Sequence, residues 1–253
     1  MTARLLLDLG NRRLKSARGQ AGRCIDVQAH ALPGAGAGAA EWAAVESWLA
    51  AQHAALGDPV FVSSTRPRAL ERLRAGCLAG AELRVAGADG WPFEVATTGT
   101  GSDRILAARA GWRRAGSTRA VLVADLGSAW TLDVMDGAGT FRGGAIGAGL
   151  AAQAAGLLAA APHLPPAPAN ARSGVPATTE EALAMGRFGA LAAALDGLAA
   201  RFETALGATG ATGAARLVTG GDASCMQSWL GPAWEPAPDL VLEGLARLAT
   251  GAP

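Results

Sequence analysis

The chain has 253 residues, half of them hydrophobic, and a formal net charge of +1. This length and apolar content predict one large or two small domains with a substantial core. Charges of both signs are balanced and form no long run, which excludes the profile typical of nucleic-acid or membrane-surface binding. No apolar stretch is long and uncharged enough to predict a membrane span, and Asp8 interrupts the N-terminal apolar run too early for a signal peptide.

The three cysteines, Cys24, Cys77 and Cys225, are odd in number and far apart in the sequence. Their spacing matches neither a disulfide framework nor a metal site. We therefore expect reduced thiols in a cytoplasmic protein.

The first half of the chain alternates short apolar strands with helices. The strands are expected at Arg4–Asp8, Arg23–Ala29, Pro59–Ser63 and Glu82–Val85. Apolar residues at helical spacing predict the first helix, and a turn with a proline predicts the start of the second. The helices are expected at Glu41–Ala55, Ala69–Leu78 and Asp103–Arg114.

The second half begins with an apolar strand and again combines strands with helices. The strands are expected at Ala120–Asp125, Trp130–Met135, Thr140–Ile146 and Arg216–Val218, the middle two as a hairpin. Residues 162–176 are expected to form a proline-rich loop. The helices are expected at Leu150–Ala160, Thr179–Leu206, after Asp222, and at Asp239–Ala249.

An apolar strand that ends in Asp-x-Gly occurs twice, at Asp8 and at Asp125. The repetition predicts two similar α/β lobes, residues 1–118 and 119–253, with both turns at one cleft. Two acids and two glycine turns suit a metal-bound triphosphate. The sequence contains neither the P-loop pattern nor the Rossmann fingerprint, so any nucleotide site is of another kind.

Lys15 is the single lysine among 22 Lys and Arg residues, and it lies shortly after the first Asp-x-Gly turn. A compact ammonium on a flexible stem can reach a phosphate as a point charge. We expect either a phosphate contact here or a solvated turn beside an edge strand.

Four motifs in chain order resemble those of the type III pantothenate kinases. Asp8-Leu9-Gly10-Asn11 with Lys15 resembles the first phosphate motif, and Gly101-Ser102-Asp103-Arg104 resembles the Gly-x-Asp-Arg signature. Residues 125–133, which read DLGSAWTLD, resemble the second phosphate motif. Gly143-Gly144-Ala145-Ile146 with Gly149-Leu150 resembles the segment that follows it.

This resemblance implies the α/β fold of the acetate and sugar kinase, Hsp70 and actin superfamily, with two RNase H-like lobes and a cleft between them. It implies transfer of the ATP γ-phosphoryl group to pantothenate, the first step of coenzyme A synthesis. It also implies a divalent metal such as Mg²⁺, a monovalent cation such as K⁺ or NH₄⁺, and a homodimer. From the balanced charge we expect no nucleic-acid or membrane partner.

The resemblance also assigns site residues. Asp103 is expected to be the general base, because phosphoryl transfer needs a carboxylate that orients the hydroxyl and accepts its proton. The monovalent cation is expected at Asp125. Substrate contacts are expected at Gly101, Ser102, Asp103, Arg104 and Thr179. ATP contacts are expected at Ser128 and at Asp8, Leu9, Gly10, Asn11, Arg12, Arg13, Leu14 and Lys15, with Asp8 orienting magnesium through water.

Simpler interpretations stand beside these roles. Asp103 could cap the helix that follows it, and Thr179 could start a helix. The chain departs from the family pattern at Arg12, Ser128 and Ala148, and it lacks the family's pocket tyrosine, near which Trp91 or Phe93 could line the site instead.

Two other functions remain open from the sequence. One is a regulatory protein like the Bvg accessory factors, without kinase activity. The other is a kinase of a different small alcohol.

Overall fold

The computed structural model describes residues 3–34, 36–166, 174–208 and 213–251. They form two compact units: Met1–Ala110 with Asp239–Pro253, and Gly111–Pro238. This grouping places the closing helix with the first unit, whereas the sequence predicts lobes at 1–118 and 119–253. The lobe division itself stays a prediction.

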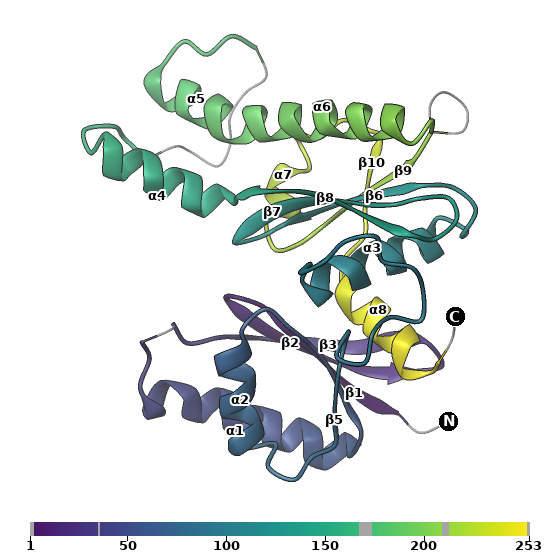
Figure 1. The fold of residues 1–253 in the computed structure, drawn as a ribbon. Helices are drawn as coiled ribbons and strands as arrows, with labels where there is room; N and C mark the ends of the chain where they lie inside the picture. The colour runs from purple at the N-terminus through teal and green to yellow at the C-terminus, as the bar shows by residue number, and fades with distance from the viewer. Residues whose placement is uncertain (1–2, 35, 167–173, 209–212, 252–253) are drawn as a thin grey trace. The chain divides into compact units, whose positions relative to one another are not determined.

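The first unit contains a five-stranded sheet in the order β3-β2-β1-β4-β5 (Figure 1). The central strand β1 pairs antiparallel with β2 and parallel with β4. β2 pairs antiparallel with β3, and β4 pairs parallel with β5. The strands are β1 (Arg4–Leu9), β2 (Arg13–Gln20), β3 (Arg23–Ala31), β4 (Val60–Ser64) and β5 (Leu83–Val85).

Helices lie on both faces of this sheet (Figure 1). On one face, alternate leucines of β1 form a buried cluster with α1 (Ala39–Leu56) and α2 (Pro67–Ala75). On the other face, α8 (Leu240–Ala249) packs against β1 to β4. Leu6 of β1 points to this second face and fills the space beside Gly19 of β2. The period-2 alternation of β1 therefore supplies apolar side chains to both faces.

The second unit repeats the same plan, with the order β10-β9-β6-β7-β8. The central strand β6 pairs antiparallel with β7 and parallel with β9, as β1 does with β2 and β4. The predicted hairpin is confirmed as the antiparallel pair β7 and β8. The strands are β6 (Val121–Leu126), β7 (Ala129–Met135), β8 (Phe141–Ala148), β9 (Ala215–Thr219) and β10 (Trp234–Pro236).

The main helical layer of this unit is one continuous stretch with a π-helical segment between two α-helices. α5 (Thr179–Ala184) runs into a π-helical segment, η1 (Met185–Gly189), and then into α6 (Ala190–Ala205). α6 packs into the core through Leu191, Leu195 and Ala199. The remaining helices are α3 (Ser102–Arg114), whose last turn belongs to this unit, α4 (Leu150–Ala160) and α7 (Ala223–Met226).

The stretch Thr179–Ala205 is long and apolar enough to cross a membrane by length and composition. A single helix of this kind is weak support for a span, because core helices of soluble proteins pass the same test. One face of α6 lies in the core cluster of this unit.

Two strands were missed by sequence reasoning. The expectation of a turn at Lys15 was wrong, because Lys15 lies within β2. β2 reads RLKSARGQ and buries mainly small residues, so it lacks the β-branched and aromatic enrichment that marks a strand. β10 has three residues and ends in proline, too short to show a period.

Candidate active site

Three polar residues form a row across the first sheet at the end of β1. Asp8 is the direct partner of Lys15 on β2 and of Ser63 on β4. Directly paired residues of neighbouring strands share a face. The row therefore lies on the α8 face, opposite the buried leucines Leu7 and Leu9.

The turn after β1 is closed by a hydrogen bond from the Gly10 amide to the Arg13 carbonyl, 3.0 Å long. Asn11, Arg12 and Arg13 are exposed on this turn. Leu9 and Leu14, which the resemblance includes among the ATP contacts, are core residues. Any contact they make with ATP would have to use the backbone.

Lys15 is held by an acidic residue from the far end of the chain. Its Nζ lies 2.8 Å from Oδ1 of Asp239, and each side chain is 27% exposed. Asp239 has a left-handed backbone, with φ of 59°, and directly precedes α8. The predicted phosphate-binding ammonium is thus ion-paired in the structure, a partner that sequence reasoning did not identify.

The Gly-x-Asp-Arg signature forms the start of α3. The helix begins at Ser102, whose hydroxyl lies 2.9 Å from that of the buried Ser63 on β4. This bond ties the signature to the strand beside Asp8. Asp103 follows within the first turn, so it is not the residue that precedes the helix as a cap. Its Oδ1 accepts a hydrogen bond of 2.9 Å from the Arg104 amide.

Gly101 leaves room for the Asp103 carboxylate. A Cβ at position 101 would lie 2.6 Å from Oδ1 of Asp103, closer than van der Waals contact allows. The signature therefore requires glycine at this position for a steric reason, because any larger residue would push the carboxylate away.

Burial raises the pKa of Asp103 above its ordinary value, and the Arg104 amide and guanidinium oppose that rise. Desolvation disfavours the charged form of a carboxyl group. A carboxylate with a raised pKa is a better proton acceptor, which suits a general base.

The second unit carries a matching row. Asp125 on β6 is the direct partner of Thr131 on β7 and of Thr219 on β9. Thr131 donates a 2.8 Å hydrogen bond to Oδ2 of Asp133, two residues along the same face and buried. The equivalent central strands of the two sheets thus each carry an acid flanked by polar side chains on both neighbours.

Close backbone approach shapes the turn after β6. Gly220 has φ of +97°, and a Cβ there would lie 2.3 Å from the Leu126 carbonyl oxygen and 2.5 Å from Oδ1 of Asp125. The Ser128 carbonyl accepts a 3.2 Å hydrogen bond from the Gly149 amide, the N-cap of α4. Ser128 therefore lies where the second phosphate motif meets the start of a helix.

The described residues contain no group of three or more His, Cys, Asp or Glu placed to hold a metal ion. A magnesium ion bound through one carboxylate, phosphate oxygens and water does not need such a group. Asp8 fits that arrangement as a single carboxylate beside Lys15.

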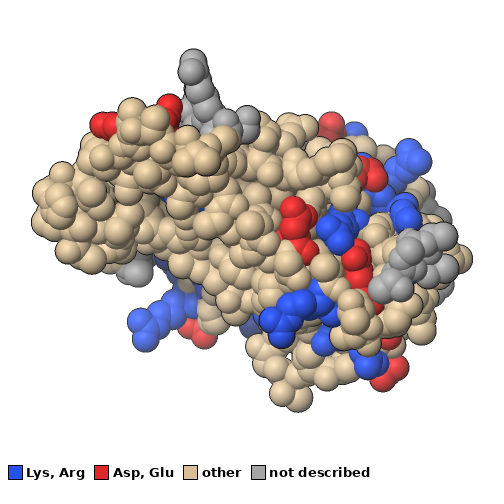
Figure 2. Space-filling model, turned by 90° about the horizontal axis from the view of Figure 1, so that it is seen from above, with Lys and Arg blue, Asp and Glu red and all other residues tan. Residues whose placement is uncertain are grey.

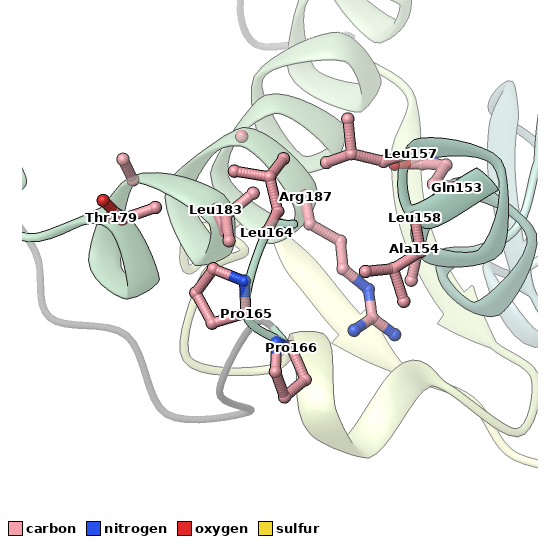
Figure 3. A pocket seen from close by; sticks show the side chains of 12 residues that line it. Gln153, Ala154, Leu157, Leu158, Leu164, Pro165, Pro166, Thr179, Leu183 and Arg187 are labelled. Carbon is pink, nitrogen blue, oxygen red and sulfur yellow. The ribbon is translucent and has the colours of Figure 1, made fainter. Parts of the chain in front are cut away.

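Thr179 is the first residue of α5 but not its cap. Thr178 is the N-cap, and its hydroxyl accepts a 3.2 Å hydrogen bond from the Glu181 amide. The capping pattern Thr-x-x-Glu was readable one residue earlier in the sequence. Thr179 instead lines a cavity together with Gln153 and Arg187 (Figure 3).

A family model for type III pantothenate kinases matches residues 4–201. The type III pantothenate kinase of Stenotrophomonas maltophilia strain K279a is 34% identical over 256 residues, with 98% of each chain covered. That of Xanthomonas campestris pv. campestris strain B100 is also 34% identical, with 97% of this chain and 96% of the relative covered.

Solved structures show the same fold at low identity. A Campylobacter jejuni protein assigned to the Baf family of transcriptional activators has a TM-score of 0.66 at 18% identity, with 98% of each chain covered. A glucokinase from Streptomyces griseus, in complex with glucose and AMPPNP, has a TM-score of 0.53 at 14% identity, with 98% and 99% covered. ADP-bound MreB5 of Spiroplasma citri has a TM-score of 0.53 at 13% identity, with 99% and 97% covered.

These likenesses, together with the two sheets of equal topology, confirm the predicted fold of the sugar kinase, Hsp70 and actin superfamily. Two findings identify the family as well as the fold. The family model matches most of the chain, and a relative is one-third identical along nearly its whole length. The chain belongs to the type III pantothenate kinase family.

Proposed function

We infer that this protein transfers the γ-phosphoryl group of ATP to pantothenate and so forms 4'-phosphopantothenate, the first step of coenzyme A synthesis. The observation that carries the inference is the signature at α3: Gly101 makes room for the carboxylate of Asp103, and burial raises its pKa. A partly buried carboxylate with a raised pKa suits a general base, which supports a kinase over a regulatory protein without kinase activity.

The proposed roles follow the family motifs. Asp103 orients the primary hydroxyl of pantothenate and takes its proton as the phosphoryl group arrives. Arg104 supplies a planar, permanently charged group for the substrate carboxylate or the phosphoryl group. Gly101, Ser102 and Thr179 complete the substrate contacts.

The nucleotide contacts are proposed for both Asp-x-Gly turns. Asn11, Lys15 and Ser128 bind phosphate oxygens, and Asp8 orients Mg²⁺ through water. Magnesium bound to the phosphates neutralises charge that develops during transfer. The row Ser63, Asp8 and Lys15 supports this proposal, because it places a carboxylate and an ammonium on one face of the sheet.

We propose that Asp125 binds a monovalent cation such as K⁺ or NH₄⁺. Hard cations prefer oxygen ligands, and Asp125 lies between two threonines on neighbouring strands. Turnover measured in potassium, ammonium and sodium chloride, for the wild type and Asp125→Ala, tests this role. Equal turnover of the wild type in all three salts would refute it.

We propose that the protein is a cytoplasmic homodimer. The free thiols Cys24, Cys77 and Cys225 are consistent with that compartment. α4 supports self-association, because it contains no charged residue and leaves Leu157 and Leu158 at least 40% exposed. Charged side chains are sparse on the left of the face in Figure 2, the part of the second unit that holds α4 and α5. Leu157→Glu should give a monomer by light scattering, and an unchanged mass would contradict a contact at α4.

A substrate panel tests the proposed reaction. ADP release is measured with pantothenate, glucose, glycerol and acetate as acceptors, and the product is identified by mass spectrometry. Turnover with pantothenate alone supports the inference. Turnover with another alcohol instead would identify a different kinase, and no turnover with any acceptor would favour a regulatory protein.

A further inference from the structure

The turn between β1 and β2, residues 10–13, is held by hydrogen bonds to its carbonyl groups. The Arg13 carbonyl accepts the bond that closes the turn, and the Arg12 carbonyl accepts a 2.8 Å bond from the Leu32 amide, just after β3. The Asn11 carbonyl accepts a bond of 3.4 Å from Nη1 of Arg66. Because this third bond comes from a side chain, a substitution can remove it and leave the backbone of the turn unchanged.

The bond from Arg66 fixes the orientation of the peptide that joins Asn11 to Arg12. A peptide bond is planar and trans, so its carbonyl and its N–H point in opposite directions. With the carbonyl bound to Arg66, the N–H of residue 12 points away from the guanidinium. A flip of this peptide would exchange the two groups and turn the partial negative charge of the carbonyl oxygen the other way.

This orientation matters for an anion. Backbone N–H groups of a turn can bind a phosphate, whereas carbonyl oxygens repel it. The Asn11 amide donates no hydrogen bond within the residues that the structure describes. The β1–β2 turn therefore combines an available amide with carbonyl groups that are already bound elsewhere, as a phosphate-binding turn requires.

Arg66 is itself held in place on the first unit. It is the N-cap of α2, and its amide donates a 3.1 Å hydrogen bond to Oγ of Ser64. The same Nη1 that reaches the turn also donates a 2.9 Å bond to the Pro33 carbonyl. The guanidinium carbon lies 5.8 Å from the centre of the ring of the buried Trp42. These contacts position the guanidinium before any ligand binds.

The charge of Arg66 is not neutralised by these contacts. Both of its side-chain acceptors are neutral carbonyls, and it forms no ion pair with a carboxylate in the described part of the chain. Arg66 is partly exposed, so solvent screens the effect of its charge on a nearby anion. Arg68, two positions along, is fully exposed and allows the effect of charge to be measured by itself.

We propose that Arg66 is a positioning residue for nucleotide binding, which holds the peptide between Asn11 and Arg12 in the orientation that accepts phosphate oxygens. It acts through this peptide and not by contact with the phosphates. The inference rests on the proposed function, because it assumes that the β1–β2 turn binds ATP. It adds a residue that lies outside all four motifs of the sequence.

Calorimetry on the full-length protein, with AMPPNP and Mg²⁺ as the probe, tests this role without turnover. Arg66→Met removes the donors but keeps a long stem beside Trp42, and Arg66→Lys keeps the charge and one donor group. Arg68→Met removes an equal charge from the exposed side of α2 and is the matched control. We expect Arg66→Met to weaken AMPPNP binding at least about tenfold, the size of one lost hydrogen bond to a charged group. Arg66→Lys should lie between that variant and the wild type, and Arg68→Met should bind as the wild type does.

Steady-state kinetics separate positioning from a general loss of structure. The ATP KM should rise in Arg66→Met while the pantothenate KM stays unchanged, because the lost bond reaches only the β1–β2 turn. A purely structural role of Arg66 would instead lower the urea midpoint of unfolding and leave AMPPNP binding by the folded protein unchanged.

Equal AMPPNP binding by the wild type and Arg66→Met would overturn the proposal and leave the proposed reaction intact. Equal weakening in Arg66→Met and Arg68→Met would also overturn it, because loss of charge would explain both results. A wild type that binds no AMPPNP would refute the proposal together with the proposed reaction. A wild type that binds AMPPNP but does not phosphorylate pantothenate would refute the reaction alone, and the comparison of variants would still decide the role of Arg66.

Discussion

Lys15 and Asp239 are separated by 224 positions in the sequence, yet their side chains form an ion pair of 2.8 Å. The pair joins β2, beside Asp8, to the start of α8 within the first unit. Two roles are open to Lys15: a phosphate ligand, or an anchor for the helix. The two roles predict different effects on ATP binding when Lys15 or Asp239 is substituted.

Removing either partner should cost little stability, at most about 1 kcal/mol, because a partly exposed ion pair is screened by solvent. If Lys15 binds phosphate, Lys15→Met raises the ATP KM at least about tenfold, whereas Asp239→Asn changes it little because the ammonium remains. Steady-state kinetics at varied ATP and urea unfolding measure the two effects. Equal small losses of stability and an unchanged ATP KM in both variants would show that Lys15 is only an anchor.

Asp103→Asn should lower kcat by about 10²- to 10⁴-fold, the usual contribution of a positioned general base. It should not destabilise the fold, since the amide oxygen can still accept the bond from the Arg104 amide. Because the carboxyl pKa is raised in the folded state, ionisation of Asp103 opposes folding above its unfolded pKa. The melting temperature at neutral pH should therefore equal or exceed that of the wild type. Near-normal turnover of this variant would show that Asp103 is not the general base.

The pH dependence of kcat/KM for pantothenate should follow the same carboxyl group. Desolvation raises its pKa, so the acid limb of the profile should lie above the value of about 4 for an ordinary aspartate. Activity should fall as pH decreases through that limb, because the base becomes protonated. Circular dichroism over the same pH range checks that the fold persists. An acid limb at or below the ordinary value would contradict a partly desolvated base.

Gly101→Ala should damage catalysis without unfolding the protein. The added Cβ would meet Oδ1 of Asp103, the end of a side chain that can rotate away at small cost. We expect kcat to fall at least about tenfold through loss of the positioned carboxylate, with an almost unchanged melting temperature. Full activity in this variant would mean that the carboxylate position is not critical.

Gly244→Ala should instead destabilise the fold. A Cβ at this position on α8 would lie 2.7 Å from the Leu106 carbonyl oxygen on α3, and backbone cannot move aside as a side chain can. The expected loss is about 1–3 kcal/mol, typical of overpacking. Gly197→Ala on α6 is the matched control, because no atom lies within 4 Å of its added Cβ. The control should gain about 0.5–1 kcal/mol from helix propensity. Urea unfolding of both variants measures the difference, and equal stabilities would contradict close packing at Gly244.

The fold was largely predictable because its signals are local. The leucine run of β1 and the apolar run of β6 each end in Asp-x-Gly, and the motifs follow in order. β2 escaped prediction because only the pairing with β1 and β3 makes it a strand, and its sequence alone is polar.

The site was predictable where the interacting residues belong to the same short motif, as Gly101 and Asp103 do. It was not predictable where distant segments meet. Nothing in the sequence pairs Lys15 with Asp239, or Ser63 with Ser102, because each contact depends on how strands and helices pack.

Transfer of the labelled γ-phosphoryl group from ATP to pantothenate tests the central inference most directly. Purified wild-type protein and Asp103→Asn are incubated with γ-labelled ATP, Mg²⁺, K⁺ and pantothenate, and the product is analysed by mass spectrometry. We predict labelled 4'-phosphopantothenate with the wild type and at least about a hundredfold less with the variant. If the wild type leaves pantothenate unlabelled, the proposed reaction is contradicted. If both proteins label pantothenate equally, the role of Asp103 is contradicted.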